Sequence, residues 1–455
     1  MTDLSFGYID YICDMKRIIT FLMTLGLLMV PATARAQKDS TKVNKLTVGL
    51  NLLAHGELCV GGLPADNDGT DEDMSAFLMG RMRLNVGYTR PYLEIKATIQ
   101  NLAIWGMSGN TALGLYEGWA KVTAPCGLFA QVGRIALSYD DERIIGPNDF
   151  AAASNTHDVL RIGYEGHGHK VHAILGYNQN GENVYSSSYY VNGAQLYKNL
   201  QTLWYHYDFP TLGASVLFMN MGQQAGVKGD ETNPPRTVYQ QLLGGYVKWH
   251  PKFMSLEGAY YKQWGKTVGK GMGALGLDAW MASAKVTVPV PKQVELTAGY
   301  DYLSGDSYVP VPSPGGLGMI RHDVLRGFTP LYGSRTKFYG MMDYFYTSAY
   351  INGLTPGLQN AFAGVSWKPG KFSGAITYHY LAVATDLEKL SRTLGHSAEA
   401  QLSYSFTKDI SLSVGYTLMH GTETMERLKQ GKGSPFAHWG WFSLVISPDI
   451  FTGKW

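Results

Sequence analysis

The breaks between consecutive strand-like segments alternate in length along the chain. Short breaks with turn residues fall at 89–91, 125–127, 166–169, 210–211, 251–252, 290–292, 369–371 and 407–409. Long breaks lie between them, at 61–74, 102–112, 138–157, 179–198, 222–237, 265–277, 305–356, 384–396 and 421–436. An up-and-down barrel alternates tight turns with longer loops, whereas the Greek-key connections of a sandwich do not alternate so strictly. Eight short and nine long breaks predict 18 strands, an even number that fits a bacterial outer-membrane barrel.

The segments between the breaks alternate apolar and polar residues with period two. In the clearest segment, Ile95 and Ile99 share one face, and Glu94 and Lys96 share the other. Such strands have one apolar and one polar face. Stretches of about ten residues also match the length that a tilted membrane-spanning strand needs. The sequence therefore predicts an all-β fold, a transmembrane antiparallel up-and-down β-barrel with short periplasmic turns and long extracellular loops.

The composition excludes several other classes of protein. Charged residues make up 16% of the chain, against about 25% in a typical soluble domain. No apolar run of about 20 residues follows the first few dozen positions, which argues against a helical membrane protein. The aromatic content of 13% argues against disorder, and the net charge of +2 gives no case for binding nucleic acid.

The N-terminal residues have the order of a secretory signal peptide. Lys16 and Arg17 precede an apolar run over 18–30, and Ala34-Arg35-Ala36 is a small-residue cleavage pattern. We expect residues 1–36 to comprise an upstream extension, with Met15 as the true start, and a cleaved signal peptide; an N-terminal membrane anchor is the alternative. Residues 37–455 would form a single barrel in the Gram-negative outer membrane, with both termini periplasmic.

Further expectations concern the partners of the barrel, its assembly signal and its cysteines. Outer-membrane lipid and the barrel-assembly machinery are the expected partners, and Phe451 or Trp455 is the candidate assembly signal. Cys59 and Cys126 fall at opposite ends of the predicted wall, about 25 Å apart, so we expect them not to form a disulfide.

A barrel of this size is too wide for side chains to fill, so its inward face should carry the function. Strand phase places these charged residues inward: Arg81, Arg83, Glu94, Lys96, Glu117, Lys121, Arg161, Glu257, Lys285, Glu295, Asp301 and Glu399. Basic residues concentrate in the first third of the wall and acidic residues dominate the rest, which would set a transverse field across the lumen. These charges could equally pair with cross-strand neighbours, and the two interpretations are compatible.

Two long breaks have features beyond those of ordinary loops. The segment 138–157 is dense in charge around Gly146-Pro147, which predicts an ordered loop held by ion pairs at or inside the mouth; a solvated extracellular loop is the alternative. The segment 335–346 also has the pattern of a strand, but counting it would give an odd number. We therefore place it inside the 305–356 connection, folded into or over the pore.

Several motifs in this order resemble the alginate-export family of outer-membrane porins. They are Tyr116–Ala120, Gln131–Arg134, Tyr139, Asp141, Arg143, Asp149-Phe150, His157–Arg161, Lys337–Phe345 and Gly357–Asn360. The resemblance implies an 18-stranded barrel, an arginine-rich lumen that passes an anionic polysaccharide, and loops that gate the mouth. It implies that Arg134, Arg143 and Arg161 are lumenal, with Asp141 and Asp158 as partners. Tyr139, Asp149 and Asp343 would lie at the mouth, and Phe150 stands where the family usually has Trp.

Two features depart from the family pattern. Straight alternation gives Arg134 the phase of Leu128 and Val132, which should face lipid, where a charge costs roughly 2–4 kcal/mol. We therefore expect a bulge near Gly133 that turns Arg134 inward. The inward charges are also nearly balanced, whereas a pore for polyanions should be clearly basic.

The sequence thus predicts an outer-membrane channel for oligosaccharides, polysaccharides or other bulky hydrophilic solutes. A general or peptide-selective diffusion porin is the alternative. An enzyme is a weaker hypothesis, because the pairs His157-Asp158 and His206/Asp208 have no serine partner at a fixed spacing. Glu165, His167 and His169 fit a solvated turn better than a metal site, and no cofactor is expected.

Overall fold

The computed structural model describes residues 44–61, 74–107, 111–150, 154–180, 186, 188–189, 195–269, 273–306, 312–313, 316–317, 324–342, 356–387, 390–429 and 435–455. Residues 44–455 form one compact unit. The expected extension and signal peptide lie outside the described residues, as does Asp343, so both expectations remain predictions.

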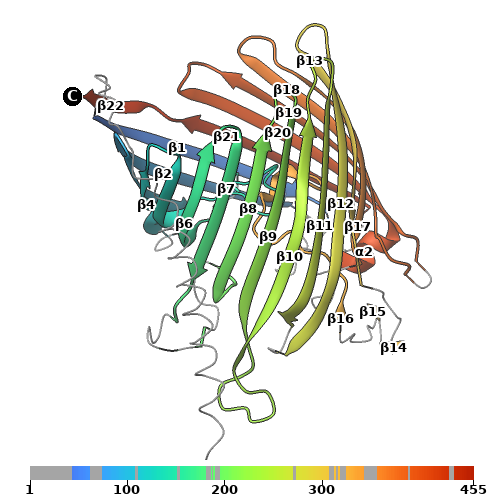
Figure 1. Cartoon of the computed structure of the whole chain (residues 1–455). Helices are drawn as coiled ribbons and strands as arrows, with labels where there is room; N and C mark the ends of the chain where they lie inside the picture. Colours follow the sequence, from blue (N-terminus) through green and yellow to red (C-terminus); the bar gives the residue numbers. More distant parts are fainter. Residues whose placement is uncertain are drawn as a thin grey trace, which may run out of the picture. The chain divides into compact units, whose positions relative to one another are not determined.

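The wall of the barrel consists of antiparallel strands that follow the order of the sequence (Figure 1). They are β1 (Lys45–Val60), β2 (Met74–Arg90), β3 (Leu93–Ile104), β4 (Thr111–Thr123), β5 (Leu128–Ile135), β6 (His157–Gly166), β7 (His169–Tyr177), β8 (Asn199–Asp208), β9 (Leu212–Ala225), β10 (Arg236–Trp249), β11 (Ser255–Val268), β12 (Ala274–Val290), β13 (Val294–Leu303), β17 (Leu358–Trp367), β18 (Phe372–Ala382), β19 (Thr393–Ser405), β20 (Ile410–Gly421), β21 (Phe436–Ile446) and β22 (Asp449–Lys454).

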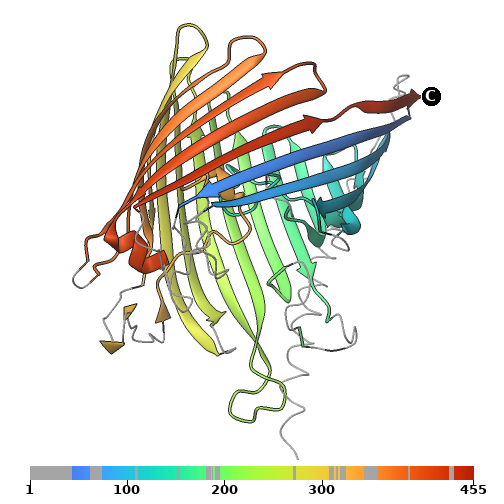
Figure 2. The ribbon, with the colours of Figure 1, turned by 180° about the vertical axis from the view of Figure 1, so that it is seen from behind.

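The first strand closes the barrel by pairing on both edges. One edge of β1 pairs with β2, and the other pairs with β21 and then β22, which continue one another along β1 (Figure 2). When β21 and β22 are counted together, the wall has 18 strands, so the predicted fold class and strand number are confirmed. We call the end with the short connections the turn end and the other the loop end.

The remaining elements lie in the loop-end connections. These are β14 (Pro312–Ser313), β15 (Gly316–Leu317), β16 (Val324–Leu325), the 3-10 helix η1 (Arg335–Lys337) and the helix α2 (Glu423–Lys429). The strand pattern at 335–346 was therefore rightly kept out of the wall, because its described part begins with η1. Among the described residues, no helix is long and apolar enough to cross a bilayer.

The exposure of side chains follows the predicted alternation. Leu52, Leu84 and Ile99 point outward and are exposed, whereas the polar Gln263 and Asn360 point inward and are buried. An exposed apolar outer face is the arrangement expected of a barrel that contacts lipid. Cys59 and Cys126 are free thiols near the loop end and the turn end, as expected.

The inner face of the barrel differs between its two sides. Large apolar side chains on β9, β10 and β12, such as Met219, Leu242 and Met281, point inward and are almost completely buried. The inner faces of β17–β20 carry short side chains instead, including Ser366, Ala375 and Ser403. We call the two sides the apolar wall and the short wall.

Two loops fold into the barrel and cover the apolar wall. We call the described residues 136–150 and 154–156, between β5 and β6 in the sequence, the first inward loop, and the described residues 324–342, between β13 and β17, the second inward loop. Leu137 and Ile145 of the first, with Phe328 and Tyr332 of the second, join the apolar wall in one buried cluster. Because water-exposed apolar area is unfavourable, this wall stabilises the inward position of both loops.

The position of Arg134 corrects the sequence prediction. No register shift occurs beside Gly133, and the bulge lies in β4 instead, between the partners of Thr98 and Ile99. Arg134 keeps its outward phase, as does Asp158 directly opposite it on β6, so neither side chain points into the lumen. Charge pairing, rather than a turned side chain, offsets the cost of placing Arg134 outside.

The Arg134 pair is bidentate. Its Nε and Nη2 lie 2.8 and 2.7 Å from the two carboxylate oxygens of Asp158. Its Nη1 also donates to the carbonyl of Leu115, at 3.2 Å, on the part of β4 beyond the end of its pairing with β5. The pair therefore joins three strands at the place where β5 ends.

This geometry predicts a coupled effect of substitution at the pair. Arg134→Leu or Asp158→Leu alone leaves one uncompensated charge on the outward face and should lower the free energy of unfolding by about 1–2 kcal/mol. The double leucine variant should regain most of the loss. Urea unfolding of barrels refolded into lipid vesicles measures this, and a double variant as unstable as the two losses added together would contradict it.

Candidate functional site

The two inward loops pair with one another inside the barrel. Ile145 and Tyr332 form a parallel bridge. The Gly146 amide donates to the Tyr332 carbonyl at 2.9 Å, and the Tyr332 amide donates to the Ile144 carbonyl at 3.0 Å. The Ser334 amide donates to the Glu142 carbonyl at 2.9 Å. We call this unit, residues 142–146 with 332–334, the loop clasp.

Arg143 connects the loop clasp to the barrel wall. Its guanidinium is buried and lies 3.1 Å from Asp141 in its own loop and 3.0 Å from Asp301 on β13. It also donates to Tyr339 and to Ser283, at 3.1 and 3.0 Å. Burial alone would lower the pKa of Arg143, but the charges of Asp301, Tyr339 and Asp141 outweigh it and keep this pKa above its usual value. The guanidinium therefore remains charged where it is buried.

A chain of polar side chains extends from this arginine across the wall. Asp301 accepts a hydrogen bond from Asn360 at 2.9 Å, and the Asn360 Oδ1 lies 2.9 Å from Nδ1 of His379. His379 lies 3.7 Å from Glu399, whose other oxygen accepts the Met341 amide of the second inward loop at 2.6 Å. The loop is thus attached to β13, β17, β18 and β19 through buried polar groups, which bind it in one position.

Glu142 and Lys337 form a second link within the loop clasp. The Glu142 carboxylate pairs with the Lys337 ammonium and accepts from Ser138 and Ser334, at 2.8 and 2.9 Å. Burial raises the pKa of Glu142, but the hydrogen bond from Lys337 and the serine hydroxyls outweigh it, so this pKa lies below its usual value. The side chain of Lys337 is half exposed, so this pair borders open space inside the barrel.

The C-terminal part of the first inward loop contacts β2, whereas Arg143 contacts β13. Arg83 on β2 donates to the Asp149 carboxylate and to the Ser154 hydroxyl, at 2.8 Å each, and Arg81 donates to the Asp149 carbonyl at 2.9 Å. Both arginines point inward and are only 5% exposed. Arg81 and Arg83 therefore hold the loop and do not present free charge to the lumen.

Phe150 strengthens this attachment. Its ring lies 5.1 Å from His55 and 5.2 Å from Trp441, on the first and last strands of the wall. Such edge-to-face contacts add to the stabilisation from burial. The part of the first inward loop around Phe150 therefore packs against β1 and β21, the two strands that close the barrel.

Most of the other predicted charges face inward and are paired. Lys96 pairs with Glu117, and Lys285 with Glu257 at 2.9 Å. Arg161 donates to Gln131 and to the Tyr139 hydroxyl, while Lys121 lies over the Phe129 ring at 4.5 Å. Glu94 and Glu295 lie on inward positions near the turn end. Their roles in solute passage remain predictions.

Asp140, Asn360 and His379 are not among the site residues predicted from the sequence. Asp140 is buried among Ser215, Trp204 and Tyr261, and accepts from the first two at 2.6 and 3.0 Å. Burial raises its pKa, although both hydrogen bonds oppose that rise. The inward phase of Asn360 and His379 on their strands could have identified them, but nothing in the pattern of the loop distinguishes Asp140 from Asp141.

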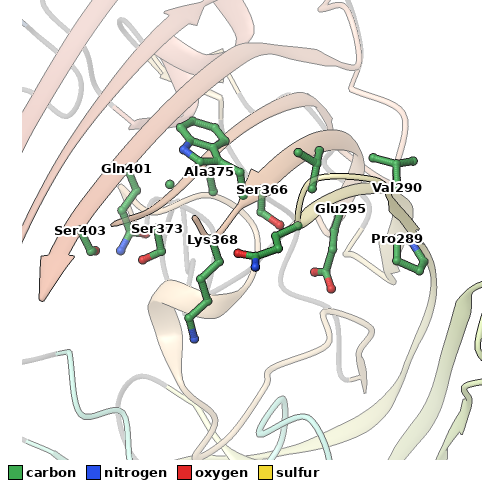
Figure 3. A pocket seen from close by; sticks show the side chains of 13 residues that line it. Pro289, Val290, Glu295, Ser366, Lys368, Ser373, Ala375, Gln401 and Ser403 are labelled. Atoms are coloured by element: carbon green, nitrogen blue, oxygen red, sulfur yellow. The ribbon is translucent and has the colours of Figure 1, made fainter. Parts of the chain in front are cut away.

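Open space remains along the short wall. A cavity of about 300 Å³ lies beside the second inward loop and is bordered by Lys285, Phe338 and Thr377. A second, of about 510 Å³, lies toward the turn end, where Ser366, Ser373, Gln401 and Ser403 surround it (Figure 3). The two share Ser366 and Ala375 in their linings, so they lie next to one another.

Two further cavities lie along β1–β4, where the first inward loop contacts β2. One, of about 370 Å³, is bordered by Arg83, Lys96 and Asp149, and the other, of about 280 Å³, by Glu94 and Lys96. Open space therefore lies beside the loop clasp on both sides. The described residues include no cluster of three or more His, Cys, Asp or Glu side chains that could hold a metal ion.

The attachment of Asp149 predicts a dependence on pH. Burial raises the pKa of Asp149, but the charge and hydrogen bond of Arg83 outweigh it, so this pKa lies below the ordinary 3.8. The pair therefore stabilises the fold above that ordinary value, and this contribution is lost as the pH falls through the lowered pKa. The effect should be below about 1 kcal/mol, because the carboxylate is half exposed.

Urea unfolding as a function of pH tests this. Between pH 4 and pH 2, the free energy of unfolding of the native chain should fall by more than that of Asp149→Asn, which has already lost the charge. The difference between the two decreases should be below about 1 kcal/mol. Asp386→Asn is the matched control, because Asp386 also pairs with an arginine but is exposed at the loop end. Parallel pH profiles for the native chain and Asp149→Asn would contradict the prediction.

Comparison with known proteins identifies the fold. No family model and no curated protein matches the chain. Among solved structures, Pseudomonas aeruginosa OccK11 (OpdR) has a TM-score of 0.57 at 13% identity, over 90% of this chain and 96% of that one. P. aeruginosa OccK9 (OpdG) has a TM-score of 0.59 at 12% identity, over 89% and 98%.

A BenF-like porin from Pseudomonas fluorescens Pf-5 has a TM-score of 0.57 at 12% identity, over 89% of this chain and 99% of that one. At such low identity the likeness concerns the fold alone. The chain has the barrel fold of outer-membrane porins, and the resemblance to the alginate-export family remains a prediction.

Proposed function

We propose that this chain is an outer-membrane diffusion channel for small hydrophilic solutes, with its turn end and both termini in the periplasm. The porin fold, the exposed apolar outer face and the polar open space along the short wall support this proposal. The proposal favours the alternative of a diffusion porin over a polysaccharide exporter. Outer-membrane lipid, the barrel-assembly machinery during biogenesis and the transported solute would be its partners.

The observation that carries the proposal is that the first inward loop, which includes part of the loop clasp, is attached to two sides of the barrel. Arg143 binds it to β13, and Arg81 and Arg83 bind the same loop to β2. A polysaccharide chain would require a wide lumen or a loop that moves aside readily. Loops held by buried ion pairs restrict passage to the spaces beside them, which suit small solutes.

Charge also argues against a polyanion as the solute. An export pore for polyanions should present free basic groups along its path. Here Arg81, Arg83 and Arg143 are buried in contacts with the loops and the wall, and Arg134 lies outside. One related solved structure, P. aeruginosa OccK2 (OpdF), is in complex with glucuronate. For this chain we take single sugars and sugar acids as the solutes to test first.

An enzymatic role receives less support from the geometry. His157 points inward and Asp158 outward on β6, so these neighbours cannot act as a pair. His206 and Asp208 lie 2.8 Å apart, but Lys170 also binds Asp208, which fits a structural ion-pair cluster near the turn end. We propose no catalytic residue.

Single-channel recording in planar lipid bilayers tests the proposed function. The refolded full chain should insert and carry a steady ionic current in potassium chloride, with weak selectivity between cations and anions, because the lumenal charges are nearly balanced. Radiolabelled sugars should enter vesicles that contain the barrel, whereas long polyuronate chains should not. A folded, inserted barrel that carries no current, or that passes polyuronate chains, would contradict the proposal.

A further inference from the structure

Polar side chains on neighbouring strands lie in register along one side of the larger cavity on the short wall. Ser366 on β17 is opposite Glu295 on β13 and Ala375 on β18, and Ala375 is opposite Gln401 on β19. One step closer to the turn end, Ser373 is opposite Ser403. Because the serine and alanine side chains among them are small, they leave open space beside them, and the cavity of about 510 Å³ is within the range of small-molecule sites.

The polar groups around this space can both donate and accept hydrogen bonds. A serine hydroxyl does both, and the glutamine amide offers an acceptor oxygen and a donor nitrogen. The Ser403 hydroxyl already lies 2.8 Å from that of Ser413 on β20, so the hydroxyl row continues along the sheet. A solute with many hydroxyl groups matches such a surface, whereas a carboxylate can only accept.

The charges bordering the cavity do not favour an anion. The cavity is bordered by one carboxylate, Glu295, and one ammonium group, Lys368. These opposite charges give an ionic solute no net attraction. The arginines that could have attracted an anion, Arg81, Arg83 and Arg143, are bound to the loops and to acidic residues elsewhere in the lumen.

The position of the cavity places it on the open route. It adjoins the cavity beside the second inward loop through Ser366 and Ala375, and it continues toward the turn end. A solute that passes the loop clasp along the short wall would therefore meet these side chains next.

We propose that the short-wall cavity around Ser366, Gln401 and Ser403 is a binding subsite for a neutral, hydroxyl-rich solute the size of one or two sugar units. This rests on the proposed channel function and specifies its solute class. The subsite holds the solute by hydrogen bonds to the short wall, and its balanced charges give sugar acids no advantage.

Block of the ionic current by added sugars tests the subsite in the full-chain barrel. Maltose should reduce the current through the native channel at lower concentration than glucuronate does. In the double variant Ser366→Ala with Gln401→Leu, the half-blocking maltose concentration should rise about tenfold, because two hydrogen-bonding groups are lost. Thr47→Ala with Asn85→Leu, in the cavity beside β1–β3, is the matched control and should leave the half-blocking maltose concentration unchanged.

Calorimetric titration of maltose into the detergent-solubilised barrel gives a second readout. A loss of maltose binding in the short-wall variant, at an unchanged unfolding midpoint, supports the subsite. Tighter block by glucuronate than by maltose, or equal maltose block in the native chain and the short-wall variant, overturns it while the channel function stands. A folded barrel that carries no current but binds maltose through these residues contradicts the channel and supports the subsite.

Discussion

The structure depends on a large apolar surface on the inside of a barrel that is too wide to fill itself. Met219, Leu242 and Met281 project from strands of the apolar wall into space that water would otherwise occupy. Burying such side chains contributes about 1.5–3 kcal/mol each. The first and second inward loops meet this constraint by placing their own apolar residues there. The open part of the lumen is consequently displaced to the short wall and to β1–β4.

Arginines hold this arrangement in place, and this role differs from the one that the sequence suggested. Arg83 binds the tip of the first inward loop, and Arg143 binds its middle to β13. A buried guanidinium is tolerated only with acidic partners and further hydrogen bonds, which both residues have. Accessible charges inside the barrel include lysine–glutamate pairs, such as Lys337 with Glu142 and Lys285 with Glu257, in which opposite charges offset one another.

The wall could be predicted from the sequence because strand phase and turn spacing are local properties. They gave the correct strand number and the inward position of Arg81 and Arg83. Arg134 was misplaced although Asp158 was expected among the partners, because only the strand register shows that both side chains point outward and offset each other's charge there. The loop clasp could not be predicted, because the bridge between Ile145 and Tyr332 joins distant segments that carry no shared pattern. The same holds for the polar chain through Asn360 and His379.

We propose that Arg143 holds the loop clasp inside the lumen and thereby limits the channel. The most direct measurement is the single-channel conductance of Arg143→Leu, with Arg427→Leu as control, because Arg427 forms an exposed ion pair with Glu423 on α2. We expect a larger and less steady current for Arg143→Leu and a native current for the control. A folded Arg143→Leu barrel with native conductance and native current noise would contradict it.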